Sequence, residues 1–202
     1  MKKKKSALIL ALIFLALANY QLAKLGQRVT LELFPAASYP WSITSWWLLV
    51  CGIPALLTWR DSGFRFDLTQ WQKNWKDLLL LELIILAGMV LFVAAGVTKY
   101  FHDVKYPMIF FIVTPVVEEL LFRGWIYGQL QRLNWYPVLI SAALFGLHHL
   151  QYFGYHPTAF ALFQLTYTFG LGILFGLMRK KSSSIYPSLL AHIAINWISV
   201  YF

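Results

Sequence analysis

Charged residues are scarce in this 202-residue chain, at 12% of the sequence, whereas 59% of its residues are hydrophobic. A soluble domain has about a quarter charged and roughly 45–50% apolar residues, so the composition excludes an ordinary soluble domain. Acidic residues are the scarcest charged group, with 8 Asp and Glu against 17 Lys and Arg. The composition therefore indicates a membrane protein with an excess of basic over acidic residues.

Cysteine is almost absent as well, because the chain has only Cys51. One cysteine excludes an internal disulfide and a cysteine-based metal cluster. Cys51 lies in an apolar run, and we interpret it as a buried structural residue.

The apolar residues are gathered in seven long runs, at residues 6–23, 41–58, 78–98, 107–128, 136–152, 158–178 and 184–202. Each run is near the ~20 residues that a helix needs to cross a ~30 Å hydrocarbon core. Because the runs are continuous and do not alternate, they indicate helices and not barrel strands. We predict an all-α, polytopic integral membrane bundle with about seven transmembrane helices, or eight. Residues 1–23 could be a signal peptide, but without a clear A-x-A cleavage site we interpret them as a retained first helix.

The basic residues indicate the orientation of the bundle. With the N-terminus in the cytoplasm, the inner segments hold Lys2, Lys3, Lys4, Lys5, Arg60, Arg65, Lys73, Lys76, Arg132, Arg179, Lys180 and Lys181, and the outer segments hold only Lys24, Arg28, Lys99 and Lys105. Cytoplasmic loops of membrane proteins are enriched in Lys and Arg. The net charge of +9 is therefore a topology signal with a secondary use on anionic lipid heads, and we expect no nucleic-acid partner. The mixed segment 60–77 is a candidate amphipathic stretch at the membrane surface.

Ionisable side chains inside transmembrane helices cost at least ~2.5–3.5 kcal/mol each at the bilayer centre, and they mark functional sites. The predicted spans contain Glu82, Glu118, Glu119, Arg123, His148, His149 and His192, with Asn196 beside them. Glu82 lies near the cytoplasmic end of its span, and we interpret it as structural.

The stretch "TPVVEELLFRGWIYGQL" divides its charges between two roles. Glu119 and Arg123 are four residues apart, so they share a helix face and can pair. Glu118 lies about 100° round the helix and has no such partner, which leaves it for use as a general base. In the next predicted span, Phe145 and His149 are also four apart on one face, and we expect His148 to point elsewhere.

The last predicted span places His192 and Asn196 four apart on one face. Their side chains offer hydrogen-bond donors of the kind that hold a developing oxyanion. At ~1.5 Å rise per residue, Glu118, His149 and His192 lie ~17, ~20 and ~12 Å from the cytoplasmic edge. Three helices thus bring polar groups to one layer in the membrane, which is hard to explain by packing alone.

These residues resemble a known family. "EELLFR" matches its EExxxR motif, "FGLHH" its FxxxH motif and "HIAIN" its HxxxN motif, in the right order on separate helices. The chain resembles the CAAX protease and bacteriocin-processing (CPBP or Abi) intramembrane proteases, which include type II CAAX prenyl endopeptidases. The resemblance covers residues 107–202, a catalytic core of about four spans, and leaves 1–106 as a variable region of about three spans.

The resemblance implies an all-helical bundle around a conical cavity and a role for each motif residue. Glu118 is the expected general base, with His149 beside it on the attacking water. His192 and Asn196 are the expected oxyanion site, and Glu119, Arg123 and Phe145 are its expected structural support. The resemblance implies a glutamate-type mechanism without a cofactor. Zinc held by Glu118, His149 and His192 is the alternative, since three ligands from separate helices can form such a site.

The sequence predicts an intramembrane endopeptidase in a bacterial plasma membrane, with the lipid bilayer and a membrane-associated peptide or protein substrate as its partners. Two other functions stay open. One is a non-catalytic immunity or scaffold protein of the same family, linked to bacteriocin self-protection. The other is a proton-coupled transporter, because intramembrane Glu and His also form proton relays, although no internal repeat supports it.

Overall fold

The computed structural model describes residues 68–97, 110–150 and 157–201 continuously, and residues 14, 18, 21–22, 24–35, 45–46 and 49–50 before them. The described residues are mostly helical and contain no strand, so the all-α prediction is confirmed for this part of the chain. Most of the predicted spans 6–23 and 41–58 lies outside the described residues, as does Cys51.

The continuous part contains α3 (Leu68–Ala94), α4 (Phe110–Glu119), η3 (Leu120–Ile126), α5 (Tyr127–Arg132), α6 (Pro137–His148), α7 (Thr158–Ser182) and α8 (Tyr186–Tyr201). The helices α4, η3 and α5 follow one another without a gap, so residues 110–132 are helical throughout and only the hydrogen-bonding pattern changes. Four predicted spans thus correspond to α4 with η3, to α6, to α7 and to α8. The predicted span 78–98 corresponds to α3, which begins ten residues earlier.

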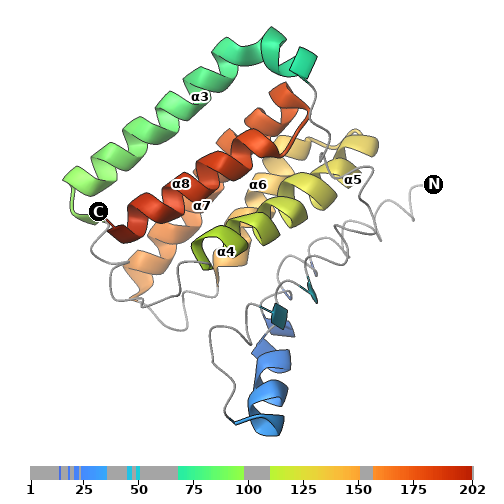
Figure 1. Cartoon of the computed structure of the whole chain (residues 1–202), viewed down its shortest axis with the longest axis vertical. Coiled ribbons are helices and arrows are strands. Elements are labelled where there is room, and N and C mark those ends of the chain that lie inside the picture. The colour runs from blue at the N-terminus through green and yellow to red at the C-terminus, as the bar shows by residue number, and fades with distance from the viewer. Residues whose placement is uncertain are drawn as a thin grey trace.

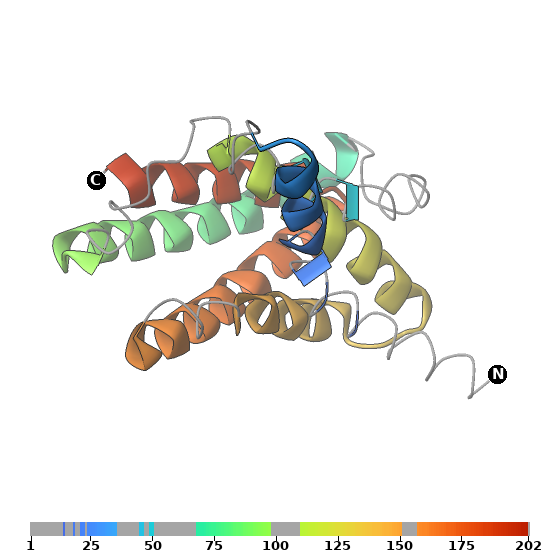
Figure 2. The same ribbon diagram turned by 90° about the horizontal axis from the view of Figure 1, so that it is seen from below.

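The helices form two layers. In one layer α3, α8 and α4 lie side by side, and in the other α6 lies beside α7 (Figures 1 and 2). One apolar cluster joins the continuous helical segment 110–132 to α6. It contains Val117, Leu121, Phe122, Ile126, Leu130, Leu144 and Phe145. A second cluster joins α3 to α7 and α8 and contains Leu78, Leu81, Ile85, Met89, Phe175, Met178, Ala191 and Ile195.

Small residues bring α6 and α7 into close contact. A Cβ atom added to Gly172 lies 2.9 Å from the Cα of Ala142, and one added to Gly176 lies 3.0 Å from a methyl carbon of Val138. Because helices in membranes associate by packing and by small residues spaced four apart, Gly172 and Gly176 set this interface. The contact fixes α6, which carries Phe145 and His148.

Two described helices, α3 and α7, are long and apolar enough to cross a membrane, and α6 is a shorter apolar helix. The segment 110–132 is not one long α-helix, because its hydrogen-bonding pattern changes at η3. The helix α8 has 16 residues, fewer than the ~20 that a span needs. The count of about seven spans and the inward N-terminus stay predictions.

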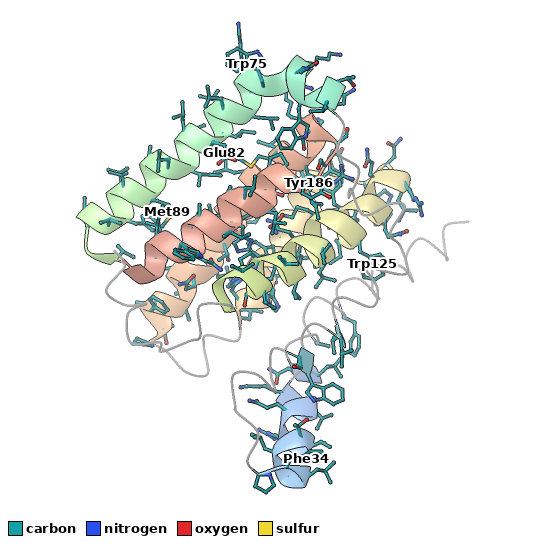
Figure 3. The ribbon with its side chains drawn as sticks, viewed as in Figure 1. Phe34, Trp75, Glu82, Met89, Trp125 and Tyr186 are labelled. Carbon is teal, nitrogen blue, oxygen red and sulfur yellow. The ribbon has the colours of Figure 1, made fainter. Side chains whose placement is uncertain are left out.

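The first turns of α3 differ from the rest of that helix. Asn74 has non-helical backbone angles, and its side-chain amide donates to the carbonyl of Lys181, at 3.0 Å. Lys181 in turn bonds Asp77 at 2.6 Å, so the end of α7 is tied to the start of α3. Trp75, which is 54% exposed, projects away from the bundle (Figure 3). Residues 60–67 of the predicted membrane-surface segment lie outside the described residues, and the position of the segment at the membrane surface stays a prediction.

Candidate active site

Glu118 and Glu119 are the last two residues of the α-helix α4, directly before the π-helix η3. Pro115 lies inside α4 and lacks the N–H that a regular helix would use there. After Glu119 the chain continues as the π-helix η3, with Arg123 in its middle. Segments with i→i+5 hydrogen bonds are rare and occur frequently at functional sites. The change of geometry therefore coincides with the predicted motif.

Glu119 is fully buried among three partners. Arg123 Nη1 lies 3.2 Å from Glu119 Oε1, His192 Nδ1 lies 3.1 Å from the same oxygen, and Ser188 donates its hydroxyl to Oε2 at 2.6 Å. The expected Glu119–Arg123 pair is present. The contacts with His192 and Ser188 were not expected, because they join helices that are far apart in the sequence.

Arg123 is held by aromatic rings as well as by its ion pair. Its guanidinium carbon lies 4.2 Å from the ring centre of Phe145 and 5.0 Å from that of Phe175, and the residue is fully buried. The Nη1–Glu119 contact is an ion pair without hydrogen-bond geometry. A buried cation over aromatic faces gains cation–π attraction, which keeps Arg123 and Glu119 in register.

Glu118 lies between two imidazole rings. His148 Nε2 is 3.7 Å from Glu118 Oε1, and His192 Nε2 is 3.5 Å from Glu118 Oε2. All three side chains are buried. Each carboxylate oxygen of Glu118 therefore faces one ring nitrogen.

His192 contacts both glutamates. Its Nδ1 faces Glu119 and its Nε2 faces Glu118. An ionised carboxylate only accepts hydrogen bonds, so a bond from His192 to an ionised Glu119 requires the proton on Nδ1. Nε2 can then donate to a developing oxyanion only when the ring carries both protons.

His149 follows the end of α6 and is buried. Its Nδ1 lies 2.8 Å from the carbonyl oxygen of Phe145, and its ring packs edge-on against Phe145 and His148, with centroids 5.0 and 5.4 Å away. Glu118 contacts His148 and His192, and the role of His149, the histidine that the motif selects, stays a prediction.

The sequence predicted that His148 points elsewhere, whereas the structure places it beside Glu118. The physical reason is that residues three apart share a helix face as well as residues four apart. Ser141, Phe145 and His148 form one stripe on α6, and each contacts Phe122. The Ser141 hydroxyl donates to the Phe122 carbonyl at 2.8 Å, and the rings of Phe145 and His148 lie 5.2 and 5.7 Å from the Phe122 ring.

Phe145 lies beside three other candidate residues of the site. The Phe145 ring is 5.8 Å from the ring of His192, so it contacts Arg123, His149 and His192 together. Asn196 lies one turn beyond His192 on α8 and is partly exposed. The roles of Glu118, His149, His192 and Asn196 in a reaction stay predictions.

Among the residues that the structure describes, no three His, Cys, Asp or Glu side chains are arranged to hold a metal ion together. Whether the reaction uses zinc or no cofactor stays a prediction.

Residues 100–198 match the family model described as type II CAAX prenyl endopeptidase Rce1-like. The match covers every site residue from Glu118 to Asn196. The comparisons with curated proteins and with solved structures find no significant match.

Proposed function

Residues 100–198 are an Rce1-like domain of the type II CAAX prenyl endopeptidase class, and from this premise we propose that the chain is a multi-pass intramembrane endopeptidase. The family is a protease family and is membrane-embedded, and the two long apolar helices agree with an integral membrane protein. The observation that carries the proposal is Glu118, buried between His148 and His192 beside the locked Glu119–Arg123 pair.

The proposed reaction is hydrolysis of a peptide bond by an activated water. Glu118 accepts a proton from water as the oxygen attacks the carbonyl carbon, assisted by His149. The carbonyl oxygen becomes an oxyanion, which accepts hydrogen bonds from Asn196 and from His192 in its doubly protonated form. When the C–N bond breaks, the proton on Glu118 passes to the leaving amine. General base catalysis supplies about 10²–10⁴-fold, and one oxyanion donor about 10²–10³-fold.

The surrounding contacts support this division of roles. Glu119 contacts Arg123, His192 and Ser188, so both of its carboxylate oxygens already have a partner. Among the described residues, Glu118 has no contact as short as those of Glu119, and catalytic hydrogen bonds are often long until substrate binds. We propose that no metal takes part, that the substrate is a membrane-associated peptide or protein tail, and that the location is a bacterial plasma membrane.

The experiment is cleavage of a fluorogenic, farnesylated CAAX peptide by the purified protein in liposomes. We expect Glu118→Gln to lower kcat by about 10²–10⁴-fold while the protein stays folded, because glutamine preserves the shape and removes the base. Glu82→Gln is the matched control, since it neutralises another carboxylate in an apolar helix outside the site. A metal chelator should leave the rate unchanged. Normal cleavage by Glu118→Gln would show that Glu118 is not the base.

A further inference from the structure

We propose that His148 is a positioning residue for Glu118, separate from the motif histidine His149. The inference rests on the proposed endopeptidase function and adds a residue that the FxxxH motif does not contain. In this arrangement His148 holds Glu118 Oε1 through its Nε2, and Glu118 Oε2 stays directed at His192 and the reacting atoms.

The packing around the ring of His148 restricts where its side chain can lie. It is the last residue of α6, and its ring is buried between the rings of Phe122 and His149, at 5.7 and 5.4 Å between centroids. One turn earlier, Phe145 packs edge-on against the same Phe122 ring. The helix α6 is itself fixed against α7 at Gly172. The position of His148 Nε2 is therefore set by packing on several sides.

The geometry around Glu118 gives the two carboxylate oxygens different neighbours. Oε1 faces His148 Nε2 at 3.7 Å and Oε2 faces His192 Nε2 at 3.5 Å, and the His148 contact is electrostatic, without hydrogen-bond geometry. A carboxylate that contacts one group on one oxygen can still rotate and swing. A second group on the other oxygen fixes the plane of the carboxylate, which a general base needs in order to meet its proton in line. His192 is anchored by Glu119, and His148 supplies the opposite anchor.

The neighbouring histidine has a different connection. His149 contacts the Phe145 carbonyl oxygen through Nδ1 at 2.8 Å. His148 faces Glu118 through Nε2. The two adjacent histidines therefore have different neighbours, and only the contact of His148 with Glu118 is used in the proposal.

The two ring nitrogens of His148, Nε2 and Nδ1, lie at different distances from the backbone, and this difference gives a direct test of the proposal. A glutamine amide nitrogen reaches about as far as histidine Nε2, and an asparagine amide nitrogen about as far as Nδ1. In the liposome assay with the farnesylated CAAX peptide, we expect His148→Gln to keep kcat within about threefold of wild type. We expect His148→Asn to lower kcat by about 10–100-fold, the usual cost of losing a group that orients a reacting one, with KM unchanged. Equal loss in both variants, or a change confined to KM, would reduce His148 to a packing residue and overturn the proposal.

A second readout does not depend on cleavage, so it separates this proposal from the proposed function. Ring ¹⁵N signals of His148, assigned by their absence in His148→Asn, are measured in nanodiscs. We expect Glu118→Gln to shift the His148 Nε2 signal and Glu82→Gln to leave it in place. If the wild-type protein cleaves nothing but this shift occurs, the proposed function fails and the contact between His148 and Glu118 stands. If Glu118→Gln leaves the His148 signal unmoved, the proposal is wrong.

Discussion

At the scale of single residues, Glu119 has a wider role than an ion-pair partner of Arg123. It accepts a hydrogen bond from Ser188 and contacts the ring nitrogen of His192. Carboxylate–imidazole contacts of this kind fix the tautomer and the orientation of a catalytic histidine. Ser188 and His192 are four residues apart on α8, so one turn of that helix supplies both partners.

Ser188→Ala tests whether Glu119 orients His192. The variant removes a buried hydroxyl bonded to a carboxylate at 2.6 Å, and hydrogen bonds to charged groups contribute about 1.5–3 kcal/mol. We expect a lower melting temperature, a reduced kcat and an unchanged KM. The matched control is Ser182→Ala, which removes another buried hydroxyl, bonded to the Met178 and Ser184 carbonyls. That variant should lose stability and keep kcat. The same kcat loss in both would contradict an orienting role for Ser188.

The spacing of residues predicted some of these contacts and not others. The i, i+4 rule predicted the Glu119–Arg123 pair correctly, because both residues belong to one helical segment. The same rule selected His149 and rejected His148, although residues three apart share a face equally well. Ser188 could not be found this way, because its partner lies on another helix and no single-helix pattern connects them. The only signal that the sequence offers is a serine one turn before a motif histidine in an apolar run.

At the scale of helices, the site depends on the contact between α6 and α7. Phe145 and His148 lie on α6, and Phe175 on α7 packs against Arg123 and against the ring of His192, at 5.1 Å between centroids. Any separation of these helices therefore moves groups on both sides of the glutamates. The close approach at Gly172 holds them together.

Gly172→Ala tests this contact. The added Cβ lies 2.9 Å from the Ala142 Cα, and overpacking of this kind costs about 1–3 kcal/mol. At roughly 2–4 °C per kcal/mol for a chain of this size, we expect a melting temperature several degrees lower. Gly170→Ala on the same helix is the control, because its Cβ meets nothing within 4 Å and alanine favours helix. A melting temperature for Gly172→Ala equal to that of Gly170→Ala would show that α6 and α7 are not held by this approach.

The break between α4 and η3 was not predictable from the sequence. The apolar run 107–128 predicted one continuous span, and the residues are indeed helical from Phe110 onward. Periodicity reports that a segment is helical, but it does not show which i→i+4 bonds become i→i+5 bonds. Pro115 was the only local indication, since it removes one backbone donor.

At the scale of the whole molecule, the described helices form a two-layer bundle that brings together Glu118, Glu119, Arg123, His148 and His192. Hydrophobic runs predicted the all-helical class and the approximate positions of α6, α7 and α8. They did not predict the layer order, because packing between helices depends on small residues and on contacts that bridge distant segments. One contact that bridges distant segments is that of Lys181 with Asp77 and Asn74, which lie more than 100 positions earlier in the sequence.

Labelling at the two ends of α7 tests the predicted topology. In a Cys51→Ala background, we expect Thr158→Cys to react with a membrane-impermeant maleimide from outside intact cells. Ser183→Cys, which follows the basic residues Arg179 to Lys181, should react only after permeabilisation, because basic segments stay inside. Both positions are exposed in the structure. Labelling of both from the same side would exclude α7 as a span, and the reverse pattern would overturn the inward N-terminus.

The most direct test of the central claim, that Glu118 makes this bundle a protease, compares the membrane proteins of host cells that express wild type, Glu118→Gln or Glu82→Gln in place of the chromosomal copy. Mass spectrometry of new peptide termini detects cleavage of any membrane protein, whichever substrate the enzyme uses. The account predicts a set of cleaved membrane-associated proteins with wild type and Glu82→Gln that is absent with Glu118→Gln. The same set of termini in all three strains would contradict it.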